Sequence, residues 1–181
     1  MCNSFNKKFL DEAAKHWSGS EDQSDGRENG FMKEAIQLAL RGVDNNDGGP
    51  FGCVVVKDGK IIGRGNNRVT SQHDPTAHAE ILAIREACDH LGSHQLEECV
   101  IYTSCEPCPM CLGAIYWARP DKVFYAATRE DAAKSGFDDA FIYEQMGLPP
   151  EQRSIEFLQM DRKEAQLAFT RWDEKEDKTE Y

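Results

Sequence analysis

The sequence predicts an α/β domain in which helices pack on a sheet that contains at least one parallel pair of strands. Apolar strand-like segments alternate along the chain with segments of helical periodicity, and an Asp-Gly pair marks a tight hairpin between the first two strands. The 181 residues, 40% of them hydrophobic, suit one domain with a core of its own.

The first helix is expected from Phe31, where apolar residues recur at helical spacing, and Gly42 is placed to end it. The segments CVVV and II then flank Asp58 and Gly59. Because this pair tolerates the positive φ of a tight turn, residues 51–65 are predicted to form two antiparallel strands.

Strands and helices continue to alternate in the second half of the chain. Asp74 and Pro75 are placed to open a helix over residues 76–91, which Gly92 would end. The further elements expected are a buried strand over 99–104, a helix from Pro107 to the Arg119-Pro120 break, a strand over 122–127, helical stretches around 131–134 and 140–145, a last strand SIEFLQM over 154–160, and an amphipathic helix through about residue 172.

The two ends of the chain differ from the domain in composition. Residues 1–29 include the polar, charged run SGSEDQSDGRENG, which buries too little apolar surface to offset its ordering entropy. We therefore expect a mobile extension over 1–29 and a domain over 30–181, ending in the acidic segment DEKEDKTEY.

Composition also limits the partners and the compartment. The 21 basic and 32 acidic residues give a net charge of −11, which opposes the approach of a polyphosphate, so nucleic acid is a disfavoured partner. No apolar run has the length of a membrane helix or a secretory signal, so we expect a cytoplasmic protein without a membrane partner. The seven cysteines are odd in number and spread through apolar segments, which favours reduced thiols.

Two short motifs indicate a metal site. HAE at 78–80 and PCPMC at 107–111 together match the H-x-E…P-C-x-x-C signature of zinc deaminases. Cys108 and Cys111 are three residues apart at a helix start, so both sulfurs can reach one ion, and the helix N-terminus favours thiolate. With His78 they make a three-ligand zinc site that leaves the fourth tetrahedral position open for water.

Glu80 is the candidate for proton transfer in this site. The metal would lower the pKa of its water, and Glu80 would take the water proton, deliver it to a ring nitrogen and then protonate the departing amine. One alternative is a closed structural site with Cys105 as the fourth ligand, which would have no use for a buried acid beside the metal. A redox CxxC pair is another, and it gives no role to His78.

Longer motifs add a family resemblance that covers residues 30–181. The segments that carry it are GGPFG, DPTAHAE, TSCEPCPMC, CLGAIYWARP, GFDDAFIY and the terminal tyrosine. Through them the chain resembles the cytidine deaminase superfamily, and within it the bacterial guanine deaminases more than the tRNA adenosine deaminases. The resemblance implies a three-layer α/β/α fold around a mixed five-stranded sheet, one zinc per subunit, hydrolysis of guanine to xanthine and ammonia, and a homodimer that exchanges its C-terminal segments, about residues 173–181.

The same resemblance assigns roles to further residues. It implies substrate contacts by Asn67, the backbone of Ala79, Phe51 and Trp117. It makes Asp139 a second carboxylate that assists Glu80, and it makes Tyr181 the residue that closes the partner's site. By residue type alone, Asn67 is also a loop residue with local hydrogen bonds, Asp139 a helix N-cap, the two ring residues core aromatics and Tyr181 a frayed end.

Three other functions stay open at this point. Guanosine as substrate depends on room for a ribose, which the sequence does not settle. A tRNA adenosine deaminase needs a basic surface, which the acidic balance disfavours, although Arg68 and His73 are similar to residues of those enzymes. The last is a zinc-stabilised binding module without turnover.

Overall fold

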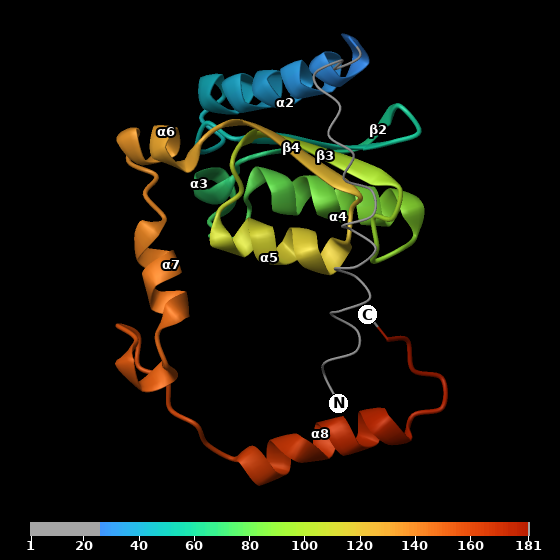
Figure 1. Cartoon of the computed structure of the whole chain (residues 1–181), viewed down its shortest axis with the longest axis vertical. Coiled ribbons are helices and arrows are strands. Elements are labelled where there is room, and N and C mark those ends of the chain that lie inside the picture. The colour runs from blue at the N-terminus through green and yellow to red at the C-terminus, as the bar shows by residue number, and fades with distance from the viewer. Residues whose placement is uncertain (1–25, 181) are drawn as a thin grey trace, which may run out of the picture.

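A mixed sheet lies at the centre of the computed structural model, which describes residues 26–180 (Figure 1). Its strand order is β2-β1-β3-β4. The strands are β1 (Gly52–Lys57), β2 (Lys60–Asn66), β3 (Cys99–Cys105) and β4 (Lys122–Ala127). β1 pairs antiparallel with β2 and β3, and β3 pairs parallel with β4, so the expected hairpin and parallel pair are confirmed.

Helices cover both faces of this sheet. Figure 1 shows α2 (Gly26–Asp44) on one face and α4 (Ala79–Leu91) with α5 (Pro109–Ala118) on the other, which confirms the three-layer arrangement. The shorter or more distant elements are α3 (Val69–Gln72), α6 (Arg129–Lys134), α7 (Ala140–Gly147), the 3-10 turn η1 (Pro150–Gln152) and α8 (Arg162–Glu174).

The core has two sides because successive side chains of β1 point to opposite faces of the sheet. Val54 and Val56 pack on the α2 side with Tyr102. Cys53 and Val55 pack on the other side, against alanines of α4. These small residues let α4 lie close to the sheet, and the start of α4 carries site residues.

α2 differs from the prediction at both ends. It begins at Gly26 rather than Phe31 and continues past Gly42 to Asp44. A Cβ on Gly42 would lie 2.8 Å from the side-chain nitrogen of Asn66. The prediction that Gly42 ends the helix is therefore wrong, because this glycine is the place where Asn66 of β2 packs against α2.

The C-terminal arm, which we define as residues 148–180, leaves the domain. Figure 1 shows it running from α7 to a detached α8. The strand expected over 154–160 is wrong within this chain, because the segment passes away from the sheet and finds no backbone partner there. The sheet of the described residues therefore has four strands instead of the expected five.

Some expectations concern residues that the structure does not describe. Residues 1–25, most of the expected extension, and Tyr181 lie outside the described residues, so the boundary at residue 30 stays a prediction. The described cysteines are all free, in keeping with reduced thiols. Among residues 26–180, no helix combines the length and the apolar character needed to cross a bilayer.

Candidate metal centre and active site

Two helix N-termini bring the candidate metal ligands together. His78 is the N-cap of α4, and Cys108 is the N-cap of α5, in which Cys111 occupies the third position. Both helices begin later than predicted. Asp74 accepts hydrogen bonds from the backbone and the hydroxyl of Thr76 and makes a turn there instead of a helix start.

A proline sets the backbone of Cys108. The residue before a proline is pushed to extended conformation, and Pro109 follows Cys108, whose φ and ψ are −64° and 167°. α5 therefore starts at Pro109 rather than near Pro107, and the Cys108 thiol stays at the mouth of the helix. The α5 N-terminus favours thiolate at this position. Hydrogen bonding by Cys111, followed by that of His78, lowers the pKa of Cys108.

The donor set fits zinc. Nδ1 of His78 lies 3.5 Å from Sγ of Cys108 and 3.5 Å from Sγ of Cys111. The three ligand atoms all lie within 4.8 Å of one another. Tetrahedral zinc, with bonds of about 2.0 Å to nitrogen and about 2.3 Å to sulfur, would hold these two kinds of ligand about 3.5 Å apart.

Cys105 is separate from this cluster. Its thiol donates to the backbone oxygen of Thr128 at 3.5 Å, and burial raises its pKa to about 11. It is absent from the group of potential metal ligands found among the described residues. The geometry therefore favours a three-ligand site over the closed alternative with Cys105.

Glu80 lies in the first turn of α4, directly behind the metal cluster. Its side chain is buried, and the hydroxyl of Thr103 donates to its Oε1 at 3.0 Å. The thiol of Cys111 lies 3.4 Å from its Oε2. Burial raises the pKa of Glu80. A carboxyl group in this position can both accept and donate a proton, as general acid–base chemistry requires.

A cavity of about 400 Å³ opens above the cluster, within the size range of small-molecule sites. It brings together most of the residues that the sequence singled out. Its lining includes His78, Glu80, Cys108, Phe51, Asn67 and Asp139. These residues come from the loops next to β1 and β2, from the starts of α4 and α5 and from the N-cap of α7, so the fold brings distant segments together around one cavity.

Asn67 makes the local hydrogen bonds expected of a loop residue and also lines the cavity. It is buried, and its Oδ1 accepts hydrogen bonds from the backbone of Gly49 at 3.1 Å and of Val69 at 3.2 Å. These bonds are the local hydrogen bonds expected of a loop asparagine. They also fix the amide plane, so its NH₂ group is the part that remains to donate to a ligand in the cavity.

Asp139 is the N-cap of α7, yet its side chain makes no capping hydrogen bond. The adjacent Asp138 instead accepts from the backbone of Ala140 at 2.9 Å. The carboxylate of Asp139 is thus available to the cavity, where burial raises its pKa.

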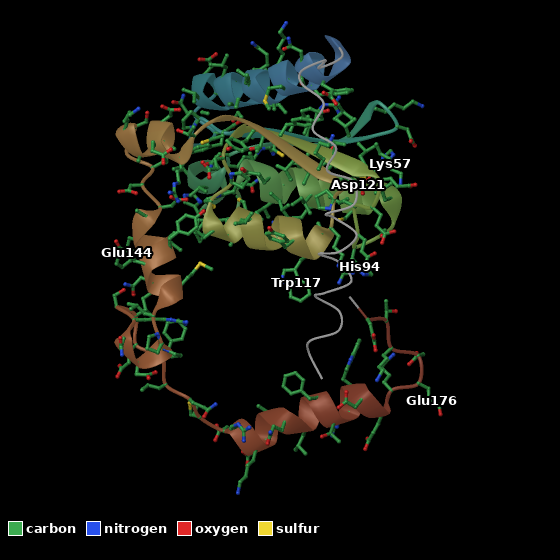
Figure 2. The ribbon with its side chains drawn as sticks, in the orientation of Figure 1. Lys57, His94, Trp117, Asp121, Glu144 and Glu176 are labelled. Carbon is green, nitrogen blue, oxygen red and sulfur yellow. The ribbon has the colours of Figure 1, made fainter. Side chains whose placement is uncertain are left out.

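Trp117 and Ala79 are not among the described residues that line the cavity. Trp117 is 64% exposed on α5, and Figure 2 shows its side chain pointing away from the sheet. Ala79 is fully buried under β2, with its side chain in the core. Tyr181 lies outside the described residues.

The sequence missed several residues of the site. In the sequence Thr103 is an ordinary residue of β3, and only the fold shows that its hydroxyl bonds to Glu80. Phe137 packs edge-on against Phe51 at 5.0 Å and completes the aromatic wall. Arg129 and Glu106 also line the cavity from loop and helix ends, where no periodic signal marks them.

Comparisons with known proteins agree with this site. The model of the cytidine and deoxycytidylate deaminase zinc-binding region matches residues 26–127. Guanine deaminase of Bacillus subtilis is 57% identical over 151 residues, which cover 83% of this chain and 97% of that protein. A tRNA-specific adenosine deaminase of Aquifex aeolicus is 43% identical over 97 residues, 54% of this chain and 64% of that protein.

A solved structure extends the agreement to three dimensions. The X-ray structure of guanine deaminase from Bacillus subtilis superposes with a TM-score of 0.82 at 56% identity, and covers 84% of this chain and 98% of that one. The family match contains both metal-ligand motifs, and the fold match spans the sheet and its helices. The chain belongs to the cytidine and deoxycytidylate deaminase family of zinc-binding proteins.

Proposed function

We propose that the chain is a zinc-dependent guanine deaminase that converts guanine and water to xanthine and ammonia. The observation that carries the proposal is the three-ligand cluster beside buried Glu80 at the base of a cavity that also presents Asn67 and Asp139. The similarity to guanine deaminase runs over nearly the whole of that relative, whereas the similarity to the tRNA enzyme covers about half of this chain.

His78, Cys108 and Cys111 hold the metal in this proposal. When bound there, zinc supplies Lewis acidity that makes a water molecule easier to deprotonate near neutral pH. Glu80 accepts a proton from the attacking water and passes it to a ring nitrogen. It then takes the second proton, from the hydroxyl now bound to the ring carbon, and delivers it to the amino group, which leaves as ammonia while the ring carbon keeps the oxygen as a carbonyl. Thr103 holds the carboxyl group of Glu80 in place during both transfers through its hydroxyl.

The other cavity residues orient the base. The NH₂ group of Asn67 donates to an acceptor of guanine, because its oxygen is engaged by Gly49 and Val69. The carboxylate of Asp139 accepts from the exocyclic amino group and assists Glu80 in proton transfer. Phe51, braced by Phe137, packs against the ring.

Glu80→Gln tests the catalytic assignment. Glutamine keeps the shape and the bond from Thr103 but removes the proton acceptor, so kcat for guanine should fall at least about 100-fold while zinc content stays at the wild-type level. Ammonia release and metal analysis on the same preparation check this. Near-normal turnover at full zinc occupancy would remove Glu80 from the reaction.

The protein works as a homodimer that exchanges C-terminal segments in our proposal. The C-terminal arm exposes large apolar side chains, among them Leu158 at 76% and Met160 at 78%, which is unfavourable in an isolated chain. β4 is an edge of the sheet, and edge strands present unpaired backbone groups. A partner's residues 154–160 can add there as a fifth strand, beside the four that the described part of this chain forms.

A cytoplasmic location completes the proposal. The free thiols at the metal centre and in the core suit a reducing compartment.

A further inference from the structure

α7 is weakly attached to the domain, although its N-cap Asp139 lines the cavity. Figure 1 shows α7 extending away from the sheet, with only its first turn near α6. The segment before it includes Gly136, whose φ is 89°. Because little of α7 is buried, the position of Asp139 depends on a few contacts at this end of the helix.

One of those contacts joins α6 to α7. The guanidinium of Arg129, the first residue of α6, lies over the ring of Tyr143 at 5.5 Å from its centroid. The backbone N–H of Arg129 donates to Glu106 at 3.2 Å, which holds the start of α6, and its Nε donates to Glu130 at 3.3 Å. A cation held over a ring face attracts the ring.

Tyr143 is tied to Asp139 through the helix backbone. The N–H of Tyr143 points to the carbonyl of Asp139, one turn earlier, at 3.4 Å. A shift of Tyr143 therefore moves Asp139. On the other side of Asp139, Phe137 packs edge-on against Phe51. Asp139 is thus held between two ring contacts, one on each side.

We propose that Tyr143, through its contact with Arg129, is a positioning residue that keeps the carboxylate of Asp139 in the cavity. The inference rests on the proposed function and deepens it. Tyr143 lines the neighbouring cavity of about 350 Å³ and not the one that contains the metal cluster, so it acts through Asp139 and not by touching the substrate. Small displacements of a reacting or orienting group lower turnover disproportionately.

Tyr143→Leu and Tyr143→Phe separate the ring from the hydroxyl. Leucine removes the ring, and kcat for guanine should fall roughly 3- to 5-fold, the size expected for loss of one exposed cation–π contact. Phenylalanine keeps the ring and should retain at least about half of the wild-type kcat. Zinc content should be unchanged in both. Equal losses in both variants, no loss in the leucine variant, or loss of zinc would each overturn the proposal.

The same pair in an Asp139→Asn background tests whether Tyr143 acts through Asp139. Once the carboxylate is gone, Tyr143→Leu should cost no further activity; a full additional loss would show that Tyr143 acts elsewhere and overturn the proposal.

Amide hydrogen exchange of residues 138–143 gives a readout independent of substrate. It should quicken in Tyr143→Leu and not in Tyr143→Phe. If wild-type protein releases no ammonia from guanine, the proposed function fails, and the exchange result alone decides whether the tether exists.

Discussion

Glu80 is held by two neighbours that differ in kind. Thr103 supplies a neutral hydroxyl from the sheet, and Cys111 supplies a sulfur from the metal cluster. Burial raises the pKa of Glu80, and the bond from Thr103 lowers it. Thr103 therefore adjusts how readily the carboxyl group of Glu80 gives up its proton, and it helps to fix the direction of the other oxygen, Oε2, which lies beside Cys111.

Thr103→Val tests this support at the residue scale. Valine is close to threonine in shape but lacks the hydroxyl, so one oxygen of Glu80 loses its donor, and kcat for guanine should fall about 10-fold, in line with the loss of a hydrogen bond to a charged group. Thr103→Ser is the matched control and should stay close to wild type. A valine variant with unchanged kcat would mean that Glu80 needs no orientation from β3.

The motifs predicted the metal ligands because spacing along a helix start is readable in one dimension. The motifs identify His78, Cys108 and Cys111 as ligands without any knowledge of the fold, and the structure brings the three side chains together. Thr103 and Phe137 reach the site only because β3 and the start of α7 are brought to it by tertiary packing. A strand threonine and a loop phenylalanine look the same in sequence whether or not they face a cavity.

Elements were predicted well in kind and less well at their ends. The sequence predicts a helix that starts at Pro107, whereas α5 starts at Pro109, which restricts the backbone of the preceding Cys108. The sequence predicts that Gly42 ends its helix, but the absence of a side chain at Gly42 instead allows the close approach of Asn66. Propensity alone cannot separate a glycine that ends a helix from one that admits a neighbour.

Gly42→Ala tests that packing role against a control in the same helix. The new methyl group would lie 2.8 Å from Asn66, whose side chain also donates to Asp47 at 2.8 Å, so the free energy of unfolding should fall by about 1–3 kcal/mol. A Cβ on Gly30 meets nothing within 4 Å, so Gly30→Ala should instead add about 0.5–1 kcal/mol. Denaturant unfolding measures both. Equal gains in both variants would contradict the close packing of Asn66 on α2.

At the scale of the whole molecule, the C-terminal arm departs most from the sequence prediction. Alternating apolar residues in SIEFLQM favour a strand, but a strand needs an edge to pair with, and the arm passes away from the sheet of its own chain. A sequence reports the tendency of a segment and not which chain supplies its partner. The same holds for Trp117, which is exposed on α5: the sequence marks it as a large aromatic residue but does not say what packs against it.

Deleting Tyr181 tests the proposed exchange of C-terminal segments. The deletion should leave zinc and the dimer intact while guanine turnover collapses. After subunit exchange with inactive Glu80→Gln protein, activity should return, because the heterodimer contains one intact catalytic centre closed by the other chain's tyrosine. A fully active deletion would make the tail a solvated end, and an inactive deletion that mixing never rescues would place Tyr181 at its own subunit's site.

Ammonia release from a panel of guanine, guanosine, adenine and cytosine, by full-length protein before and after zinc removal, tests the central claim most directly. We expect guanine to be turned over well above the other three, activity to disappear with the metal, and one zinc per subunit to restore it. Faster turnover of guanosine than of guanine would contradict the choice of substrate. A zinc-loaded protein that releases no ammonia from any of the four would contradict the assignment of a deaminase and leave a zinc-stabilised binding module.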